Sequence, residues 1–189
     1  MLILFASFLS GCTNPTVQNS SYNSDFSFYL INGEEVHISN YAGKVVLVDL
    51  TGVHCSYCVP QTFVLDEINN QYSNDDFEII SIFVWMILGE TVSQINNLID
   101  AYACISPCDL ENIFTRIQLR EAKEYYGKQE GIDMNWVIGY DNEQGALYEK
   151  YGEEGIPYLM ILDNNGNVYY SNIGLTSYSS ITEKIDELL

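Results

Sequence analysis

The feature that most constrains this chain is a pair of cysteines, Cys55 and Cys58, placed directly after a short apolar run. Residues 45–50 hold five apolar residues in six, which is typical of a buried strand, and an amphipathic run continues to Tyr72. The pattern predicts a strand, a short turn, and a helix that begins at Cys55. A helix N-terminus carries about half a positive charge, so it can lower a thiol pKa from ~8.5 to between ~3.5 and ~7.5. We therefore expect a disulfide that opens and closes, with Cys55 attacking and Cys58 resolving.

Two other readings of this cysteine pair deserve comparison. A Cys-x-x-Cys motif can be half of a zinc site, but the other half needs a second such pair or two spaced histidines. The chain holds only His37 and His54, and neither supplies that spacing. An inert structural disulfide is the third reading. We favour the redox dithiol and expect no metal and no cofactor.

Composition limits the classes of partner. The chain has 189 residues, which suits one domain, and 47% of them are hydrophobic, as in a globular core. Its net charge is −19, from 26 acids against 7 bases. Nucleic-acid binding requires clustered Lys and Arg, so this charge argues against nucleic acid as a partner.

The N-terminus suggests export and lipidation. A short apolar segment ends in Leu9-Ser10-Gly11-Cys12, which resembles the lipobox of bacterial and archaeal lipoproteins. The segment is far below the ~20 residues that a spanning helix needs, but it suits a signal peptide. It lacks the usual positive start, since no Lys or Arg precedes Lys44, and a chance cysteine is the alternative. We expect residues 1–11 to be removed, Cys12 to carry lipid, and residues 12–25 to form a flexible tether to the membrane.

The remaining chain alternates between strand and helix patterns. Strands are expected over residues 26–31 and 34–38, joined by an Asn32-Gly33 hairpin turn, and the buried strand over 45–50 is expected in a parallel sheet. The later elements expected are strands over 77–85, 134–140, 158–162 and 168–171, and helices over 90–102, 109–127, 143–151 and 178–189.

From residue 26 to the end, several motifs occur together in a familiar order. Val48-Asp49-Leu50 precedes the cysteine pair, residues 151–157 end in Gly155-Ile156-Pro157, and Gly174 follows a strand–turn–strand unit. The chain in these respects resembles the thioredoxin superfamily, and within it the TlpA/ResA-like extracytoplasmic group. The resemblance implies an α/β, three-layer thioredoxin-like fold over residues 26–189, with an N-terminal β-hairpin and a helical insert at about 103–130.

The resemblance also assigns roles to residues. It implies that Asp49 is buried behind the disulfide, where a raised pKa would let it exchange a proton with Cys58. A merely tolerated acid at a strand end is the alternative. It further implies a cis peptide at Ile156–Pro157, which would leave the Ile156 backbone free to pair with a substrate.

The chain departs from the family around the cysteines. His54 stands where the family usually has Trp, and Ser56-Tyr57 replaces the usual Gly-Pro between the cysteines. We expect all three residues to face the substrate. A protonated His54 could stabilise the Cys55 thiolate, or it could simply be solvated.

A second pair, Cys104 and Cys108, lies in the insert around Pro107. Outside the cytoplasm, where disulfides persist, a local structural disulfide is expected. A second redox pair and a copper site are the alternatives, although no histidine follows His54 to complete a copper site.

The function expected is thiol–disulfide exchange on extracytoplasmic protein substrates, as a reductase recharged by a membrane or secreted redox partner. An oxidase or isomerase would use the same residues, and a copper-binding chaperone is the non-enzymatic alternative. A peroxiredoxin is disfavoured, because Val48 and Gly52 occupy the positions where its Pro-x3-Thr-x2-Cys loop has Pro and Thr.

Overall fold

The computed structural model describes residues 24–72, 75–103, 132 and 134–189. Cys12, the expected signal segment, most of the tether, and the pair Cys104 and Cys108 with nearly all of the insert lie outside the described residues. Among the helices that are described, none combines the length and apolar character needed to cross a membrane.

One mixed sheet of seven strands organises the described part of the chain, in the order β2-β1-β5-β4-β3-β6-β7. The three strands β3, β4 and β5 are parallel, and the other neighbours are antiparallel. The strands are β1 (Ser27–Leu30), β2 (Glu35–His37), β3 (Val45–Thr51), β4 (Phe77–Phe83), β5 (Val137–Tyr140), β6 (Tyr158–Leu162) and β7 (Val168–Ile173).

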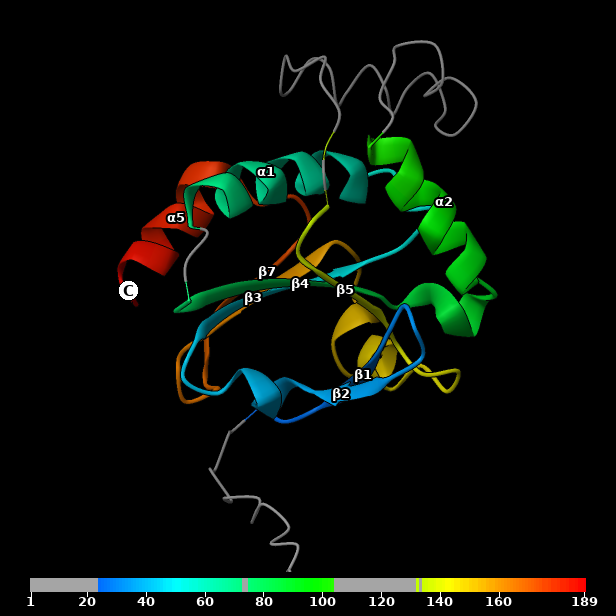
Figure 1. Cartoon of the computed structure of the whole chain (residues 1–189), viewed down its shortest axis with the longest axis horizontal. Helices are drawn as coiled ribbons and strands as arrows, with labels where there is room; N and C mark the ends of the chain where they lie inside the picture. The colour runs from blue at the N-terminus through cyan, green and yellow to red at the C-terminus, as the bar shows by residue number, and fades with distance from the viewer. Residues whose placement is uncertain (1–23, 73–74, 104–131, 133) are drawn as a thin grey trace, which may run out of the picture.

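Helices lie on both faces of this sheet, so the expected three-layer α/β fold with an N-terminal hairpin is confirmed (Figure 1). The helices α1 (Cys58–Gln71), α2 (Val92–Ala103) and α5 (Tyr178–Asp186) lie on one face. A short π-helix, η3 (Tyr148–Gly152), lies on the other. Two 3-10 helices, η1 (Ile38–Tyr41) and η2 (Trp85–Leu88), complete the elements.

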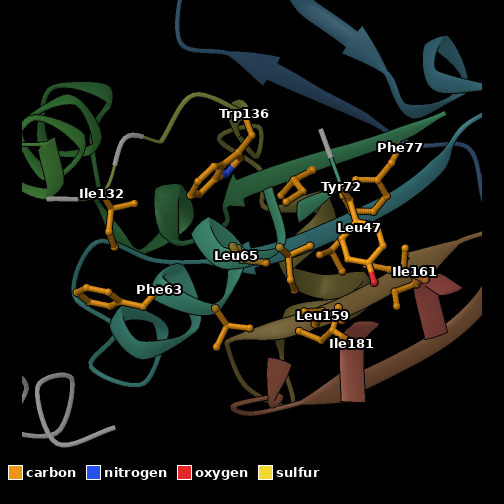
Figure 2. Close-up of a cluster of buried hydrophobic side chains, with 14 of the residues drawn as sticks. Leu47, Phe63, Leu65, Tyr72, Phe77, Ile132, Trp136, Leu159, Ile161 and Ile181 are labelled. Atoms are coloured by element: carbon orange, nitrogen blue, oxygen red, sulfur yellow. The ribbon is translucent and has the colours of Figure 1, made fainter. Parts of the chain in front are cut away.

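Strand β3 is the centre of the core, and all seven of its residues are buried. Because side chains alternate along a strand, Val45 and Leu47 face the core under α1 and α5, and Val46 and Val48 face the core on the other side. Figure 2 shows Leu47 among the side chains that fill the first of these cores. Asp49 is two residues beyond Leu47, so it points toward the same face as α1.

Helix α1 begins later than expected, at Cys58 rather than Cys55. Residues 55–57 form a turn instead, in which the Cys58 N–H donates to the Cys55 carbonyl oxygen at 3.2 Å. The attacking cysteine therefore lies in the turn that leads into the helix, and the resolving cysteine is the first helical residue.

Two other elements also differ from the sequence expectation. The strand expected over 77–85 ends at Phe83, and Trp85 and Met86 belong to η2. The helix expected over 143–151 begins at Ala146, because the Asp141 carboxylate accepts the N–H groups of Leu147 and Tyr148 at 2.9 Å each. Differences of one to three residues occur at the ends of most other elements, including β1, β2, α2, β5, β7 and α5.

Candidate active site

Cys55 and Cys58 form a disulfide at the N-terminal end of α1, with 5.3 Å between their Cα atoms. Both side chains are buried in this oxidised state, at 5% and 3% exposure. The sulfur pair lies where β3 leads into α1, so it is at the positive end of the helix dipole. This end of the helix favours a thiolate over a thiol.

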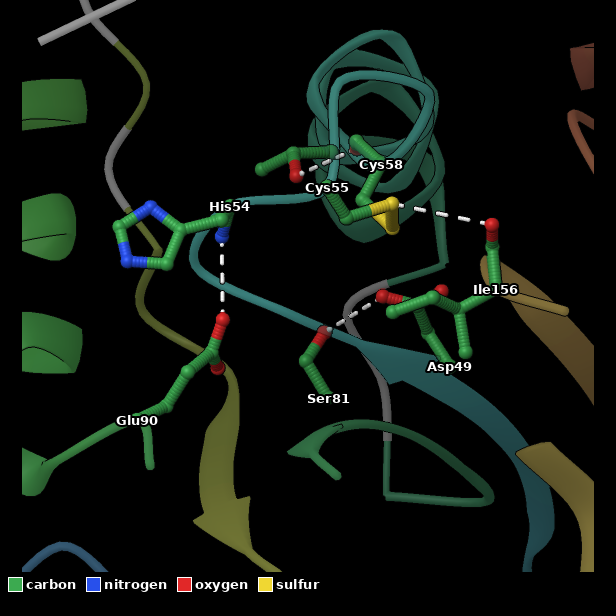
Figure 3. Close-up of a disulfide and its surroundings, with 8 residues drawn as sticks. Asp49, His54, Cys55, Cys58, Ser81, Glu90 and Ile156 are labelled. Carbon is green, nitrogen blue, oxygen red and sulfur yellow. Dashed lines mark hydrogen bonds between the residues drawn. A yellow bond between two sulfur atoms is a disulfide. The ribbon is translucent and has the colours of Figure 1, made fainter. Parts of the chain in front are cut away.

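The turn between β3 and α1 is held from below by a buried acid that the sequence analysis missed. The His54 N–H donates to Oε1 of Glu90 at 3.0 Å, and Glu90 is only 6% exposed (Figure 3).

Gly52 lies in the same turn with its backbone against other side chains. A Cβ atom at Gly52 would come within 2.8 Å of the Trp85 ring and 3.0 Å of Ile156, so no larger residue fits there.

The three residues expected to face a substrate differ in their placement. Tyr57 is 66% exposed, Ser56 is half-buried and His54 is exposed. Figure 3 shows the His54 imidazole pointing away from the two sulfur atoms. The structure therefore does not bring this ring to the Cys55 sulfur, and Tyr57 is the exposed apolar side chain beside the disulfide.

The segment before β6 forms the opposite wall of the site. The Ile156–Pro157 peptide is cis, and the Ile156 carbonyl oxygen lies 3.7 Å from the Cys55 Sγ atom. The Pro157 carbonyl accepts the Gly174 N–H at 2.7 Å, which ties this wall to the end of β7. The structure thus brings together Cys55, Cys58 and the expected cis-proline segment.

Asp49 is buried beneath the disulfide, at 2% exposure. Its Oδ2 atom accepts from the Ser81 hydroxyl at 3.4 Å, and its Oδ1 atom has no hydrogen-bond partner among the described residues. Burial raises the pKa of Asp49 from 3.8 to about 7, and the hydrogen bond from Ser81 opposes the rise. At neutral pH this carboxyl group can therefore both take and give a proton.

A small cavity connects this acid to the disulfide. It has a volume of about 10 Å³, and Asp49, Cys55, Cys58 and Thr62 are among its lining residues. A space of this size holds about one water molecule. A proton can therefore pass between the Cys58 sulfur and Asp49 directly or through one water.

No described cation contacts the sulfur pair. Lys44 pairs with Glu78 at 3.1 Å, Lys184 pairs with Glu187 at 2.8 Å, and the Lys150 ammonium lies 4.8 Å from the Tyr151 ring centroid. In the described segments, no group of three His, Cys, Asp or Glu side chains is arranged to hold a metal ion. The electrostatic support for a thiolate among these residues comes from the helix end.

Sequence reasoning missed three buried polar side chains around the site. The sequence pattern marks Glu90 only as the start of a helix. Gln61, a buried residue of α1, accepts the Thr176 N–H at 2.8 Å. Ser81 could have been found, because it interrupts an apolar strand just as Asp49 does. Parallel pairing places these two residues side by side, which the sequence could suggest only once the register was known.

The raised pKa of Asp49 should make the folding stability depend on pH. An Asp in the unfolded chain has a pKa of ~3.9, and the folded value of about 7 is higher, so folding stability falls as pH rises between these values. The Asp49→Asn substitution removes the free-energy cost of ionising a buried carboxyl group. We expect the variant to be more stable than the parent at pH 8, by on the order of 4 kcal/mol, and to gain nothing at pH 4.

Urea denaturation of the oxidised protein at the two pH values measures the difference. The matched control is Glu34→Gln, which neutralises an exposed acid in the hairpin turn and should leave the pH dependence unchanged. An Asp49→Asn variant with the parent's stability at pH 8 would contradict the raised pKa.

Comparisons with known proteins agree with this geometry. The Redoxin family model matches residues 18–174. The exposed lipoprotein thioredoxin of Streptococcus pneumoniae is similar in structure, with a TM-score of 0.57 and 22% identity over 87% of this chain and 100% of that one. StoA of Bacillus subtilis has a TM-score of 0.56 and 16% identity, over 86% and 96% of the two chains.

A thioredoxin-like protein of Aeropyrum pernix has a TM-score of 0.54 and 23% identity, over 86% of this chain and 89% of that one. No curated protein sequence matches the chain. The likeness to solved structures establishes the thioredoxin-like fold, and the family model covers more than half of the residues. The chain therefore belongs to the Redoxin family, as a thiol–disulfide oxidoreductase with Cys55 and Cys58 as its redox pair.

Proposed function

We propose that this protein is an extracytoplasmic reductase of protein disulfides, tethered to the cell membrane through a lipid on Cys12. One observation carries the catalytic part of the proposal. A buried carboxyl group, Asp49, lies beneath the disulfide with one oxygen unbonded beside a cavity that Cys58 also lines. This arrangement supports a proton acceptor for the step in which Cys58 releases the substrate.

In the first step the Cys55 thiolate attacks one sulfur of a substrate disulfide. A bond forms between the Cys55 sulfur and that sulfur, and the substrate's own S–S bond breaks. The departing substrate sulfur leaves as a thiolate and takes a proton from solvent. The product of this step is a mixed disulfide between Cys55 and the substrate.

In the second step Cys58 resolves the mixed disulfide. Its thiol gives a proton to Asp49, and the resulting thiolate attacks the Cys55 sulfur. The Cys55–Cys58 disulfide forms, and the second substrate sulfur leaves as a thiolate that takes a proton from solvent, while Asp49 gives the proton that it received back to solvent. The substrate has then gained two electrons and two protons, and a dithiol partner must return them to the enzyme.

The surroundings of the disulfide favour the reductase direction. A strong oxidant needs a reduced form stabilised as the thiolate. Here no described cation contacts the sulfurs, and the Ile156 carbonyl, 3.7 Å from Cys55 Sγ, can accept only from a protonated thiol. The buried Asp49 adds negative charge when it is ionised. These two groups offset the support that the end of α1 gives to a thiolate, so they favour the disulfide form of the enzyme as the product.

The substrate is proposed to bind across the cis-proline wall. The Ile156 backbone lies beside the disulfide, and Tyr57 offers a large exposed ring next to it. Backbone groups at this place can pair with an extended peptide of any sequence, which suits a reductase of several protein substrates.

Cysteine substitutions test the proposed reaction. We expect Cys55→Ser to abolish reduction of a protein disulfide such as that of insulin, because the sulfur that attacks the substrate is lost. Cys58→Ser should keep the attack but stop at a mixed disulfide, which nonreducing gels and mass spectrometry detect. The control is the double substitution of Cys104 and Cys108 by Ser, which should retain turnover. Normal turnover by Cys55→Ser would refute the proposed role of the pair.

The anchor makes a separate prediction. Support for it comes from the lipobox-like ending Leu9-Ser10-Gly11-Cys12. We expect the wild-type chain, expressed in a host that exports it, to sediment with membranes. The Cys12→Ala variant should instead be released, because one lipid-bearing cysteine provides the attachment. Unchanged membrane association of Cys12→Ala in cell fractionation would count against the lipid anchor and leave the redox proposal intact.

A further inference from the structure

Three buried polar side chains form a chain of hydrogen bonds beneath the disulfide. The Trp136 indole N–H donates to the Ser81 oxygen at 3.0 Å, and the Ser81 hydroxyl donates to Asp49 Oδ2 at 3.4 Å. The three residues are 7%, 1% and 2% exposed, in the same order. Because buried hydrogen bonds are little weakened by water, this arrangement is well suited to fixing a carboxyl group.

The pairing of the strands brings the three residues together. Ser81 is the partner of Asp49 between the parallel strands β3 and β4, and Ile138 is the partner of Ser81 on β5. Trp136 precedes Ile138 by two residues, so its side chain lies on the same face of the sheet. Residues far apart in sequence therefore meet in one row under α1.

When Asp49 is ionised, the hydrogens along this row can point in only one direction. An indole N–H is a donor only, so the Ser81 oxygen accepts from Trp136 and keeps its own hydrogen for Asp49. An ionised Asp49 can only accept, and a hydrogen bond to the ionised form favours it over the protonated form. Ser81 thus offsets part of the cost of burying the carboxylate.

We propose that Ser81 and Trp136 are positioning residues for the proton-transfer step, with Trp136 orienting Ser81 and Ser81 holding one oxygen of Asp49. The other oxygen has no hydrogen-bond partner among the described residues, and Asp49 lines the same cavity as Cys58. The proposal rests on the proposed function of Asp49 as the proton acceptor for Cys58. It adds a specific device that keeps this acid ionised near neutral pH and correctly oriented.

Few other groups affect the pH dependence of this site. The titratable residues that line the cavity with Asp49 are Cys55 from the turn before α1, Cys58 from the start of α1 and Tyr102 from α2. Burial raises the pKa of Tyr102 above its usual value of 10, so this phenol stays neutral between pH 5 and pH 9. No Lys, Arg or His belongs to the described cavity lining. A pH profile in that range therefore reports on Asp49 and the two cysteines.

The test separates the two chemical steps in stopped flow. Reduced protein with Cys104 and Cys108 replaced by Ala is mixed with a chromogenic aromatic disulfide. The attack of Cys55 releases a first equivalent of coloured thiol, and resolution by Cys58 releases a second. The part of the second phase's pH dependence that the Asp49→Asn variant loses gives the midpoint for Asp49, and the first phase serves as an internal control.

We expect Ser81→Ala to raise the midpoint of the second phase by about one pH unit, because the ionised carboxylate loses its donor. At pH 7 this slows resolution about fivefold, since a midpoint raised from 7 to 8 leaves about a tenth of the carboxyl groups ionised instead of about half. The rate should recover at pH 9, and the first phase should be unchanged. Trp136→Phe should shift the midpoint in the same direction by a smaller amount.

The conservative variant Ser81→Thr keeps the hydroxyl group and should keep the parent midpoint. Equal slowing by Ser81→Ala and Ser81→Thr at every pH, with no change in midpoint, would overturn the proposal and leave only a packing role. Circular dichroism checks that each variant is folded.

The Asp49→Asn background distinguishes failure of this inference from failure of the proposed function. In that background Ser81→Ala should cause no further change, because the carboxylate that accepts the Ser81 hydrogen bond is absent. If Asp49→Asn slows the second phase but Ser81→Ala leaves the midpoint unchanged, the positioning proposal is wrong and the acid's role stands. If Asp49→Asn leaves the second phase unchanged, the proton acceptor and the positioning proposal both fail.

Discussion

The burial of β3 on both faces is the constraint on which the rest of the structure depends. This strand lies between β4 and β6, and its side chains enter the cores on both sides of the sheet. Its end fixes where the turn to α1 begins, and therefore where Cys55 and Cys58 lie. A polar side chain within such a strand is unfavourable unless it is bonded or functional, so the position of Asp49 calls for a chemical reason.

The same burial explains how the site can work near neutral pH. A carboxyl group in water would be ionised at pH 7 and would be a weak base toward a thiol. Desolvation raises the pKa of Asp49 to about 7, closer to that of the thiol that it must deprotonate. The hydrogen bond from Ser81 limits this rise in the pKa of Asp49. Glu90 accepts the His54 N–H and so fixes the turn that contains Cys55. The active site thus consists of two cysteines with a buried polar layer beneath them.

Local patterns predicted most of the fold, since the buried strand, the Asn32-Gly33 hairpin and the cysteine spacing each have a signature of a few residues. The resemblance to thioredoxin-like proteins then placed Asp49 and Pro157. The features that the sequence did not predict depend on contacts between segments that are far apart along the chain. The start of α1 is set by the turn at the disulfide, and Glu90 reaches back 36 residues to His54. The Trp136–Ser81 bond spans 55 residues and requires the strand register, which no local pattern contains.

Among the described residues, the N-terminal end of α1 alone supports a thiolate, while the Ile156 carbonyl and an ionised Asp49 oppose it, and we propose that this balance makes the pair reducing. The most direct measurement is the reduction potential of Cys55–Cys58 in defined thiol–disulfide buffers, with Cys104 and Cys108 replaced by Ala. We expect a value near ~−270 mV, similar to thioredoxin, and hence a reductase that needs an electron donor. A value near ~−120 mV, as in a strong oxidant, would contradict it, because such a potential requires a stabilised thiolate.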